Sequence, residues 1–351
     1  MKKILSLLLT LSMLFSMLAV SAVSATDGAA ATSGDERIYK IEAGAKTYEL
    51  DGVVYNVIWT ADDFVSMNTV GKYILGADIA LTGKTSSGYG FFDISTSEYN
   101  SNWAIELEGN NCSVTDVDFT GTLSIFGLLY GGFISLRNLT FGEKDAPLQV
   151  KNTMNSNNGA GVIASAMEYD AVLLCDNVTI YADVDIAKQN AGLFVGNLKS
   201  ATCNVTLTNC AAYGSVKAAG MYSGFIGYNR GIENFYNCTL GVTGGLGDGL
   251  CAYTAADTVQ NLKVDLPALE ISTAEEFLAI NGYNNYKLTS DIDLGGSVVS
   301  GKIWSGTLDG DGHSVTNFST SSGMFTSGYI KGTIKNIILG TETAPININP
   351  S

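Results

Sequence analysis

A short stretch near the C-terminus, "LDGDGHSVTNF" at residues 308–318, holds the residues whose types and spacing best suit chemistry. It contains the only histidine of the chain, His313, which follows Asp311 by two positions and Asp309 by four. Carboxylates bind hard cations, and an imidazole exchanges protons near neutral pH. The stretch is therefore a candidate metal loop, a candidate acid–base site or a tight turn.

An earlier segment, "LEGNNCSVTDV" at residues 107–117, matches this stretch and favours the turn. Three of its residues align with the three chemically active positions: Glu108 with Asp309, Asn110 with Asp311, and Cys112 with His313. A catalytic histidine would not be replaced by a thiol, and a calcium loop would lose ligand charge where an amide replaces a carboxylate. We therefore expect Asp309 and Gly310 to form a structural turn, with a weak calcium contact as the alternative. No catalytic residue, other metal site or other cofactor is predicted.

Three pairs of acidic residues at spacing i, i+2 offer a second kind of candidate site. In a β-strand such a pair projects from one face, and two carboxylates at a suitable separation across a cleft can serve a glycosidase. We favour the interpretation that they belong to the solvated face of an acidic protein. The pairs are Asp116 with Asp118, Asp183 with Asp185, and Asp291 with Asp293.

The two matching stretches belong to a longer repeat. "IWTADDFVSMN" (58–68) matches "ISTAEEFLAIN" (271–281), and "LRNLTFGEKDAPLQV" (136–150) matches "IKNIILGTETAPINI" (334–348). The order and approximate spacing of these segments agree between the copies. One structural unit is therefore expected to occur twice in the chain.

Each copy begins with the signals of a short helix. Thr60 and Thr273 suit the N-cap position, and an acidic residue stands three positions after each of them, which is a capping-box pattern. We expect amphipathic helices near residues 60–68 and 273–281. Each helix would cover the unpaired strand edge at the start of a stack of strands, because such an edge otherwise invites aggregation.

Between the copies, glycine and asparagine recur at intervals of about thirty residues, a period typical of stacked β-strand repeats. The residues that we assign to bends and to one shared corner are Gly192, Gly224, Asn177, Asn209 and Asn237. Asparagine tolerates a left-handed backbone, so the three asparagines should lie at the same corner of successive repeats. Their side chains would then bond the neighbouring repeat and form a ladder.

The composition fits short strands joined by turns and excludes several classes of partner. The chain of 351 residues has 40 glycines, only 4 prolines and 46% hydrophobic residues, which suits strands better than disorder. Without Lys2 and Lys3 of the leader, 17 basic residues stand against 34 acidic ones, a net charge of −17. Such a chain repels phosphate backbones and anionic lipid, so nucleic acid is not an expected partner.

The first residues predict export. Residues 1–25 contain two lysines, an apolar core and a small-residue ending, which is the layout of a secretory signal peptide. We expect residues 26–45 to be flexible, 46–265 to form the main β-domain, and 266–351 to form a second, shorter copy of its beginning. No membrane insertion is expected after removal of the signal, and the protein is predicted to be secreted or held at the cell surface.

Six cysteines in an exported chain permit disulfides, and their pairing is left open. Cys210 and Cys238 each follow an asparagine in an apolar strand, where a small buried thiol packs well. No C-x-x-C motif occurs, so a structural zinc site is not expected.

The segment "GFIGYNRGIENFYNC" at residues 224–238 resembles the GLUG-motif repeats of large secreted bacterial surface proteins. The residues that carry the resemblance are Gly224, Gly227, Asn229, Gly231, Ile232 and Asn234. These proteins in turn resemble the right-handed parallel β-helix, or pectin-lyase-like, superfamily, and the match covers most of residues 56–351. The resemblance implies an all-β fold, a right-handed parallel β-helix (solenoid) with short amphipathic capping helices, in which these residues occupy turns and ladders.

That superfamily includes adhesins as well as lyases and glycosidases, so the fold alone does not decide the activity. Its polygalacturonase-like members are recognised by N-T-D, D-D, G-H-G and R-I-K segments. Here the only adjacent aspartates, Asp62 and Asp63, lie in the expected helix, and Gly312-His313 lacks the second glycine.

The leading interpretation is an exported, non-catalytic surface protein that acts in adhesion or glycan contact. Its expected partner is an extracellular glycan or a surface protein. The candidate ligand-binding residues are Tyr222, Tyr228 and Tyr236, whose rings could stack on sugars. The alternatives are a polysaccharide lyase or glycoside hydrolase on the same fold, and a structural spacer of a larger surface protein.

Overall fold

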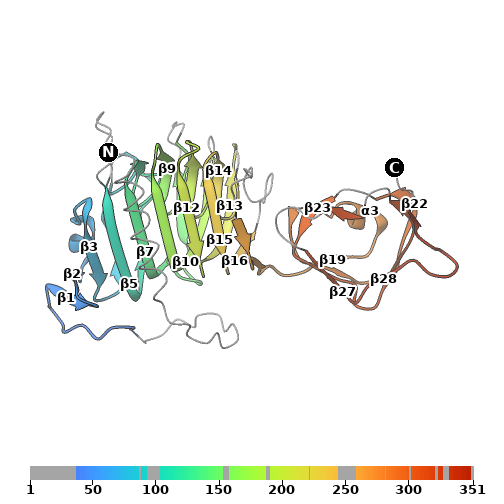
Figure 1. Ribbon diagram of the computed structural model, residues 1–351, viewed down its shortest axis with the longest axis horizontal. Helices are drawn as coiled ribbons and strands as arrows, with labels where there is room; N and C mark the ends of the chain where they lie inside the picture. The colour runs from blue at the N-terminus through green and yellow to red at the C-terminus, as the bar shows by residue number, and fades with distance from the viewer. Residues whose placement is uncertain are drawn as a thin grey trace. The chain divides into compact units, whose positions relative to one another are not determined.

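The computed structural model describes residues 37–86, 88–92, 103–152, 158–186, 190–220, 222–243, 258–280, 282–299, 302–320, 323–326 and 332–348. All of them belong to one compact unit, Arg37–Ser351. This part of the chain forms 29 strands and two short helices, so the fold is all-β (Figure 1). Among these residues no helix has the length and apolar character needed to cross a membrane. The predicted signal peptide lies outside the described residues.

The largest sheet in the described chain has 14 strands, and only the pairing between β1 and β2 is antiparallel. Its main path runs in the order β1-β2-β3-β5-β7-β10-β12-β15-β17. Its strands are β1 (Thr47–Leu50), β2 (Val53–Ile58), β3 (Val70–Leu75), β4 (Ile79–Ala80), β5 (Ala104–Thr115), β7 (Phe133–Phe141), β8 (Leu148–Asn152), β10 (Val172–Ile186), β12 (Asn204–Thr208), β13 (Ala211–Ala218), β15 (Ile232–Tyr236), β16 (Thr239–Thr243), β17 (Thr258–Gln260) and β18 (Lys263–Val264).

A second sheet has four parallel strands in the order β14-β11-β9-β6. These strands are β6 (Leu128–Tyr130), β9 (Ala164–Glu168), β11 (Val195–Leu198) and β14 (Ile226–Asn229). Figure 1 shows the strands of the two sheets following one another side by side along the green and yellow part of the chain.

Successive stretches of chain contribute the same set of strands, and we call these stretches levels 1 to 4. They are residues 128–152, 158–186, 190–218 and 222–243, and each places one strand in the four-stranded sheet and one or two in the large sheet. Residues pair with their counterparts in the next level: Leu136 with Cys175, Cys175 with Leu207, and Leu207 with Phe235. All four side chains are buried. Parallel levels therefore stack in register and share one core.

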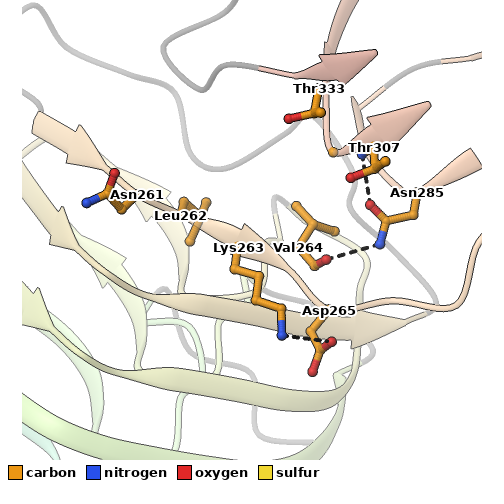
Figure 2. A pocket seen from close by; sticks show the side chains of 9 residues that line it. Asn261, Leu262, Lys263, Val264, Asp265, Asn285, Thr307 and Thr333 are labelled. Atoms are coloured by element: carbon orange, nitrogen blue, oxygen red, sulfur yellow. Dashed lines mark hydrogen bonds and ion pairs between the residues drawn. The ribbon is translucent and has the colours of Figure 1, made fainter. Parts of the chain in front are cut away.

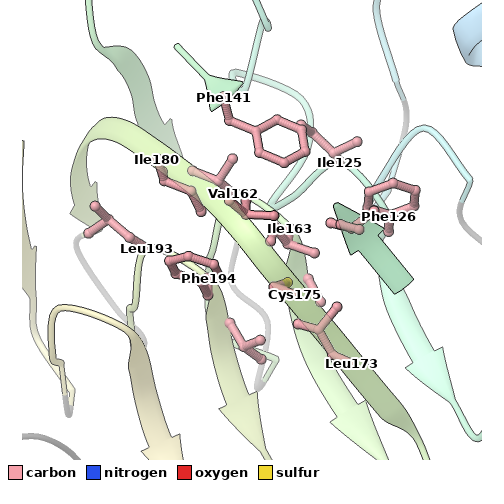
Figure 3. Packing of buried hydrophobic residues seen from close by; sticks show 14 of the residues in the cluster. Ile125, Phe126, Phe141, Val162, Ile163, Leu173, Cys175, Ile180, Leu193 and Phe194 are labelled. Atoms are coloured by element: carbon pink, nitrogen blue, oxygen red, sulfur yellow. The ribbon is translucent and has the colours of Figure 1, made fainter. Parts of the chain in front are cut away.

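The core is built from side chains that alternate along each strand. In β10, Leu173, Cys175 and Ile180 are buried between half-buried neighbours, as the two-residue period of a strand requires. Figure 3 shows them packed with Ile163 of level 2 and Phe194 of level 3. Burying one such side chain contributes about 1.5–3 kcal/mol, so this shared core is the main source of stability.

The second copy forms three smaller sheets, in the orders β19-β21-β24-β27, β20-β23-β26 and β22-β25-β28, with β29 paired to β25. Its strands are β19 (Leu269–Ile271), β20 (Gly282–Tyr283), β21 (Tyr286–Leu288), β22 (Ile292–Val298), β23 (Lys302–Ser305), β24 (Thr307–Asp309), β25 (Ser314–Thr320), β26 (Phe325–Thr326), β27 (Thr333–Lys335), β28 (Ile338–Leu339) and β29 (Asn347–Ile348). All pairings among them are parallel. Its buried side chains form a hydrophobic cluster of their own.

Both predicted helices are present, and both are shorter than predicted. They are α2 (Ala61–Val65) and α3 (Ala274–Leu278), and each begins at a threonine with a complete capping box. Residues 66–68 do not continue α2, because the Tyr73 hydroxyl bonds both the N–H and the C=O of Asn68 and holds that backbone outside the helix.

The helix does not by itself cover the first strand edge, which corrects the sequence-based expectation for α2. Strand β2 pairs with β3, and β1 pairs antiparallel with β2, so the edge strand is β1. The helix instead fixes Phe64 in the core, where it is fully buried. A short antiparallel strand, β1, therefore forms the edge of the sheet.

Residues 37–45, part of the segment 26–45 that was predicted to be flexible, make long-range contacts with residues 78–111; residues 26–36 lie outside the described chain. The Arg37 guanidinium pairs with the Asp78 carboxylate at 2.6 Å and donates to the C=O of Asn111 at 2.8 Å. The backbone N–H of Tyr39 donates to Oδ1 of Asn110 at 2.6 Å, and Nδ2 of Asn110 returns a bond to the Tyr39 C=O. These long-range contacts fix the segment against the corner at Asn110.

The last strands of the second copy are less covered than their counterparts in the first. Leu136, Phe141 and Val150 are all 0% exposed, whereas the aligned residues Ile334, Leu339 and Ile348 are 44%, 44% and 72% exposed. In the first copy, β7 and β8 pair with β10 of the next level. Among the described residues no strand stands in that position beyond β27, β28 and β29.

Candidate functional site

The corner at Asp309 is a turn whose carboxylate is fully engaged. Its Oδ1 accepts the backbone N–H of Asp311 at 3.0 Å and the Asn336 amide at 3.1 Å, and its Oδ2 pairs with Lys335 Nζ at 3.1 Å. The Asp311 N–H, followed by the Lys335 ammonium and the Asn336 amide, lowers the pKa of Asp309 to about 2. Asp311 has a left-handed φ of 49°. This carboxylate shapes the turn.

His313 lies beside the turn without completing a catalytic group. Its Nδ1 is 3.4 Å from Oδ1 of Asp291, and that carboxylate also accepts the Ser314 N–H at 2.7 Å. In the first copy, Asp78 accepts the Ser113 N–H at the same distance, although a cysteine takes the place of the histidine. The bond that both copies keep is therefore the one between aspartate and serine backbone, and it is structural.

The first copy builds the same corner from Glu108, which is 2% exposed. Its Oε1 accepts the backbone N–H of Asn110 at 2.9 Å and the Asn138 amide at 3.0 Å, and Arg137 Nε lies 3.7 Å from Oε2. Burial raises the pKa of Glu108, and the bonds from Asn138 and Asn110 oppose that effect. A buried carboxylate with these partners holds β5 against β7 of level 1.

Asparagine side chains bond from level to level along one corner. Nδ2 of Asn177 donates to Asn138 Oδ1 at 2.9 Å, Asn237 donates to Asn209 at 3.3 Å, and Asn261 donates to Asn237 at 2.9 Å. All five have φ between 50° and 55°, in the left-handed region. The sequence-based assignment included three of these residues and missed Asn138 and Asn261.

Gly192 and Gly227 are required by the close approach of neighbouring levels. Neither has a positive φ; instead, a Cβ on Gly192 would lie 2.6 Å from the Gly227 nitrogen, and one on Gly227 would lie 2.5 Å from the Ala191 nitrogen. Gly231 is crowded in the same way by the Cys203 backbone oxygen, whereas Gly224 faces the side chain of Leu240. Close packing, and not a sharp bend, explains these glycines.

Asn229 and Asn234 have separate roles in level 4. The buried side chain of Asn229 accepts the Gly231 N–H at 2.6 Å and so closes the turn after β14. Asn234 lies in β15 and donates to Asn204 Oδ1 at 3.3 Å.

Gly310 is close-packed, since a Cβ there would lie 2.5 Å from the Asn336 oxygen.

Aspartates at spacing i, i+2 accept hydrogen bonds from nearby residues. Only Asp183 and Asp185 both lie within a strand, where Asp183 accepts Gln149 Nε2 at 2.9 Å and the Ser215 hydroxyl at 2.7 Å. Asp116 lies after the end of β5 with φ 54°, so this pair does not project from a strand. No group of three potential metal-ligating side chains occurs in the described chain.

The five cysteines in the described residues are free and buried: Cys112, Cys175, Cys203, Cys210 and Cys238. Burial raises the pKa of Cys112 to about 12 and that of Cys203 to about 11. A buried protonated thiol is a poor nucleophile. Cys251 lies outside the described residues.

The three candidate tyrosines lie in different settings. Tyr222 is half-buried, pairs with Ala191 in an isolated bridge and packs against the main core. Tyr236 is half-buried in β15 of the large sheet, between Thr208 and Gln260. Tyr228 is half-buried in β14 of the four-stranded sheet. The structure therefore does not bring the three into one site.

Tyr228 instead belongs to a group of side chains at the carboxyl ends of the four-stranded sheet. Parallel strands end at the same edge, so the last residues of β6, β9, β11 and β14 come together there. We call this group the strand-end row, and its members are Tyr130, Glu168, Tyr169, Lys199, Tyr228 and Arg230. Tyr130 pairs in register with Glu168, while the N–H of Lys199 bonds Met167 and that of Arg230 bonds Leu198.

The strand-end row alternates aromatic and charged groups. The rings of Tyr130 and Tyr169 are 6.0 Å apart between centroids, and Tyr169 is 42% exposed. Lys199 pairs with Glu168 at 2.8 Å and also bonds Asn158. Arg230 Nε donates to the Tyr228 hydroxyl at 2.5 Å, and its guanidinium carbon lies 5.4 Å from the Tyr228 ring centroid. Sequence reasoning named Tyr228 and missed the others, since their alignment depends on strand register.

A separate hollow of about 510 Å³ is lined by residues 261–265 and by Asn285, Gly306, Thr307 and Thr333 (Figure 2). Asn285 bonds the C=O of residue 264 at 3.0 Å and the N–H of Thr307 at 2.9 Å. The lysine and the aspartate of the lining pair with each other at 3.4 Å. These groups bond one another, and we assign no site to the hollow.

Comparisons with known proteins add little. No family model matches the sequence, and no curated protein matches it. Among solved structures, that of a candidate immunoglobulin A1 protease from Bacteroides ovatus is similar over 85% of this chain and 84% of its own, with 13% sequence identity and a TM-score of 0.39. Similarity at this level carries no argument about activity.

Proposed function

We propose that the protein is an exported, non-catalytic β-solenoid surface protein that acts in adhesion or glycan contact. The solenoid is a right-handed parallel β-helix in this proposal, with GLUG-type repeats in its levels. The in-register parallel pairing of levels 1 to 4 and the asparagine bonds between them support it. The signal-peptide pattern of residues 1–25 supports export.

The observation that carries the functional proposal is the strand-end row. Its three tyrosines lie at or next to the carboxyl ends of the parallel strands: Tyr130 ends β6, Tyr169 follows β9 and is well exposed, and Tyr228 is the last residue but one of β14. With strands about 4.8 Å apart, four levels span about 15 Å. Aromatic rings with polar neighbours spaced over that length suit an oligosaccharide, since sugar rings pack on aromatic faces and sugar hydroxyls need hydrogen-bond partners.

A role without catalysis is supported by the bonding of the acidic residues. Glu168 is paired with Lys199, and the carboxylates of Asp183, Asp291 and Asp309 are occupied by local hydrogen bonds. A glycosidase instead needs two carboxyl groups facing a substrate across a cleft.

A glycan array probed with the mature protein, beside a reducing-sugar assay on the bound glycans, tests the proposal. We expect retention without release of product. Tyr228→Ala should weaken binding roughly tenfold, the effect of losing one aromatic contact of about 1.4 kcal/mol. Tyr181→Ala is the matched control, because Tyr181 is also a half-buried tyrosine but stacks on Tyr213 in the large sheet.

Release of reducing ends would favour the enzyme, and no retention on any glycan would refute glycan contact. Export is tested separately by N-terminal sequencing of the protein recovered from the medium or cell surface. We expect the mature chain to begin at Thr26.

A further inference from the structure

Arg230 differs from the other two arginines of the chain in its partners. Arg37 pairs with Asp78, and Arg137 lies 3.7 Å from Glu108. Arg230 is exposed and forms no ion pair with any carboxylate of the described residues; its side chain bonds the Tyr228 hydroxyl and lies over the Tyr228 ring. Arg230 is thus the one arginine that has no carboxylate partner among the described residues.

The contact with Tyr228 fixes the orientation of the guanidinium. Its Nε is used by the tyrosine hydroxyl, and the ring lies below the guanidinium carbon. The two terminal nitrogens keep their donors available. Such a planar fork binds a carboxylate through two parallel hydrogen bonds, and holding it in place beforehand reduces the entropy lost on binding.

Among the members of the strand-end row, Arg230 is the cation that has no carboxylate partner within the row. Lys199, in the neighbouring level, is neutralised by Glu168 at 2.8 Å. Arg230 therefore provides the charge that a ligand would meet there. One available cation suits one anionic group on the ligand.

We infer that the strand-end row binds glycans that carry a single carboxylated sugar, with Arg230 holding the carboxylate and the tyrosines contacting the sugar rings. This inference rests on the proposed function and names the class of glycan. Polyanionic polymers are disfavoured, because a mature chain of net charge −17 repels them as it repels nucleic acid. A single carboxylate suffers little of that repulsion at physiological salt, where charges further than about 8 Å away are screened.

The test is titration calorimetry at 0.15 M salt with three probes: 3′-sialyllactose, lactose and a galacturonic acid octamer. We expect sialyllactose to bind at least tenfold more tightly than either of the others, since a charge-assisted hydrogen bond is worth roughly ten- to a hundredfold in affinity. Arg230→Gln should remove that preference by weakening sialyllactose binding at least tenfold. Lys217→Gln is the control, because this exposed lysine is ion-paired with Asp185 in the large sheet.

Equal affinity for sialyllactose and lactose, or tighter binding of the octamer, would overturn the inference while glycan contact stands. Preference for sialyllactose that persists in a correctly folded Arg230→Gln variant would also overturn it. Absence of binding to these probes and to the whole array would refute the proposed function itself. Circular dichroism of each variant shows whether it is folded.

Discussion

Asparagine at a left-handed corner combines two roles that other side chains do not. Most L-residues lose about 1–2 kcal/mol at a positive φ, whereas the short amide of asparagine tolerates it. The amide also has both a donor and an acceptor, so each residue can bond two neighbours. Asn209 does this with φ 52°: its Nδ2 donates to Asp176 and its Oδ1 accepts from Asn237.

We expect Asn209→Ala to lower the free energy of unfolding by about 2 kcal/mol, because it strains the backbone and removes these bonds. Asn209→Gly loses the same bonds without the backbone strain, so it should cost roughly half as much. Urea denaturation followed by circular dichroism measures both. Equal losses in the two variants would contradict the role assigned to the left-handed backbone.

Acid should weaken the corner at Asp309. Its folded-state pKa, about 2, lies below its ordinary value of 3.8. The stabilisation from the charged form is therefore complete above pH 4 and is lost as the pH falls towards 2. Thermal melts should show that the melting temperature falls more steeply across this pH range in the wild type than in Asp309→Asn, which has no titrating group at this position. Parallel pH dependences of the two proteins would contradict the stabilising role of the charged Asp309 carboxylate.

How many members of the asparagine ladder can be predicted from the sequence depends on the number of residues between successive members. Asn209 and Asn237 are 28 residues apart, which is close to the general period, and these positions are readable from the sequence. Asn138 lies 39 residues before Asn177, and Asn261 lies 24 after Asn237, because neighbouring levels differ in length. A fixed period therefore misses both, although they occupy the same corner.

The short helices and edge strands are determined by different kinds of information. The capping boxes of α2 and α3 are local, so the threonine and the acidic residue three positions later predict both helix starts. The ends of the helices and the strand β1 depend on distant contacts. Tyr73 holds Asn68, and the antiparallel pairing of β1 with β2 follows a turn at Asp51, which has φ 51°. Such contacts leave little pattern in the sequence.

Thr273→Ala should destabilise the second copy by about 1 kcal/mol, because the N–H of Glu276 loses the cap oxygen. Thr333→Ala is the matched control, since Thr333 is an exposed threonine with no side-chain bond in the described structure. Thermal melts of the two variants compare them. A loss from Thr333→Ala as large as that from Thr273→Ala would contradict the capping role.

At the scale of the whole molecule, the levels of the first copy share a single core, and that core decides which groups can react. One large cluster of buried residues extends from Ile58 to Val242, and it includes all five described cysteines. The strand-end row, in contrast, gathers side chains from levels 1 to 4 on an outer edge. Hydrophobic alternation predicts the shared core, whereas the strand-end row depends on strand register, which cannot be read from a single sequence.

The buried thiols should be inert while the protein is folded. We expect the five described cysteines to remain unmodified by Ellman's reagent at pH 8, because all five are buried and inaccessible to the reagent. In guanidinium chloride all five should react. Modification of more than one thiol in the native protein would contradict this, since only Cys251 lies outside the described residues.

The exposed surfaces of Ile334, Leu339 and Ile348 have a consequence for how the molecule loosens. In an array of stacked repeats, stability is a sum of interfaces between nearest neighbours. Strands β27 to β29 have such an interface on one side within the described chain, whereas β10 has one on both. Thermal opening should accordingly start by fraying from β27 to β29 and advance inward one layer at a time, while β10 and its neighbours stay closed until the protein unfolds globally.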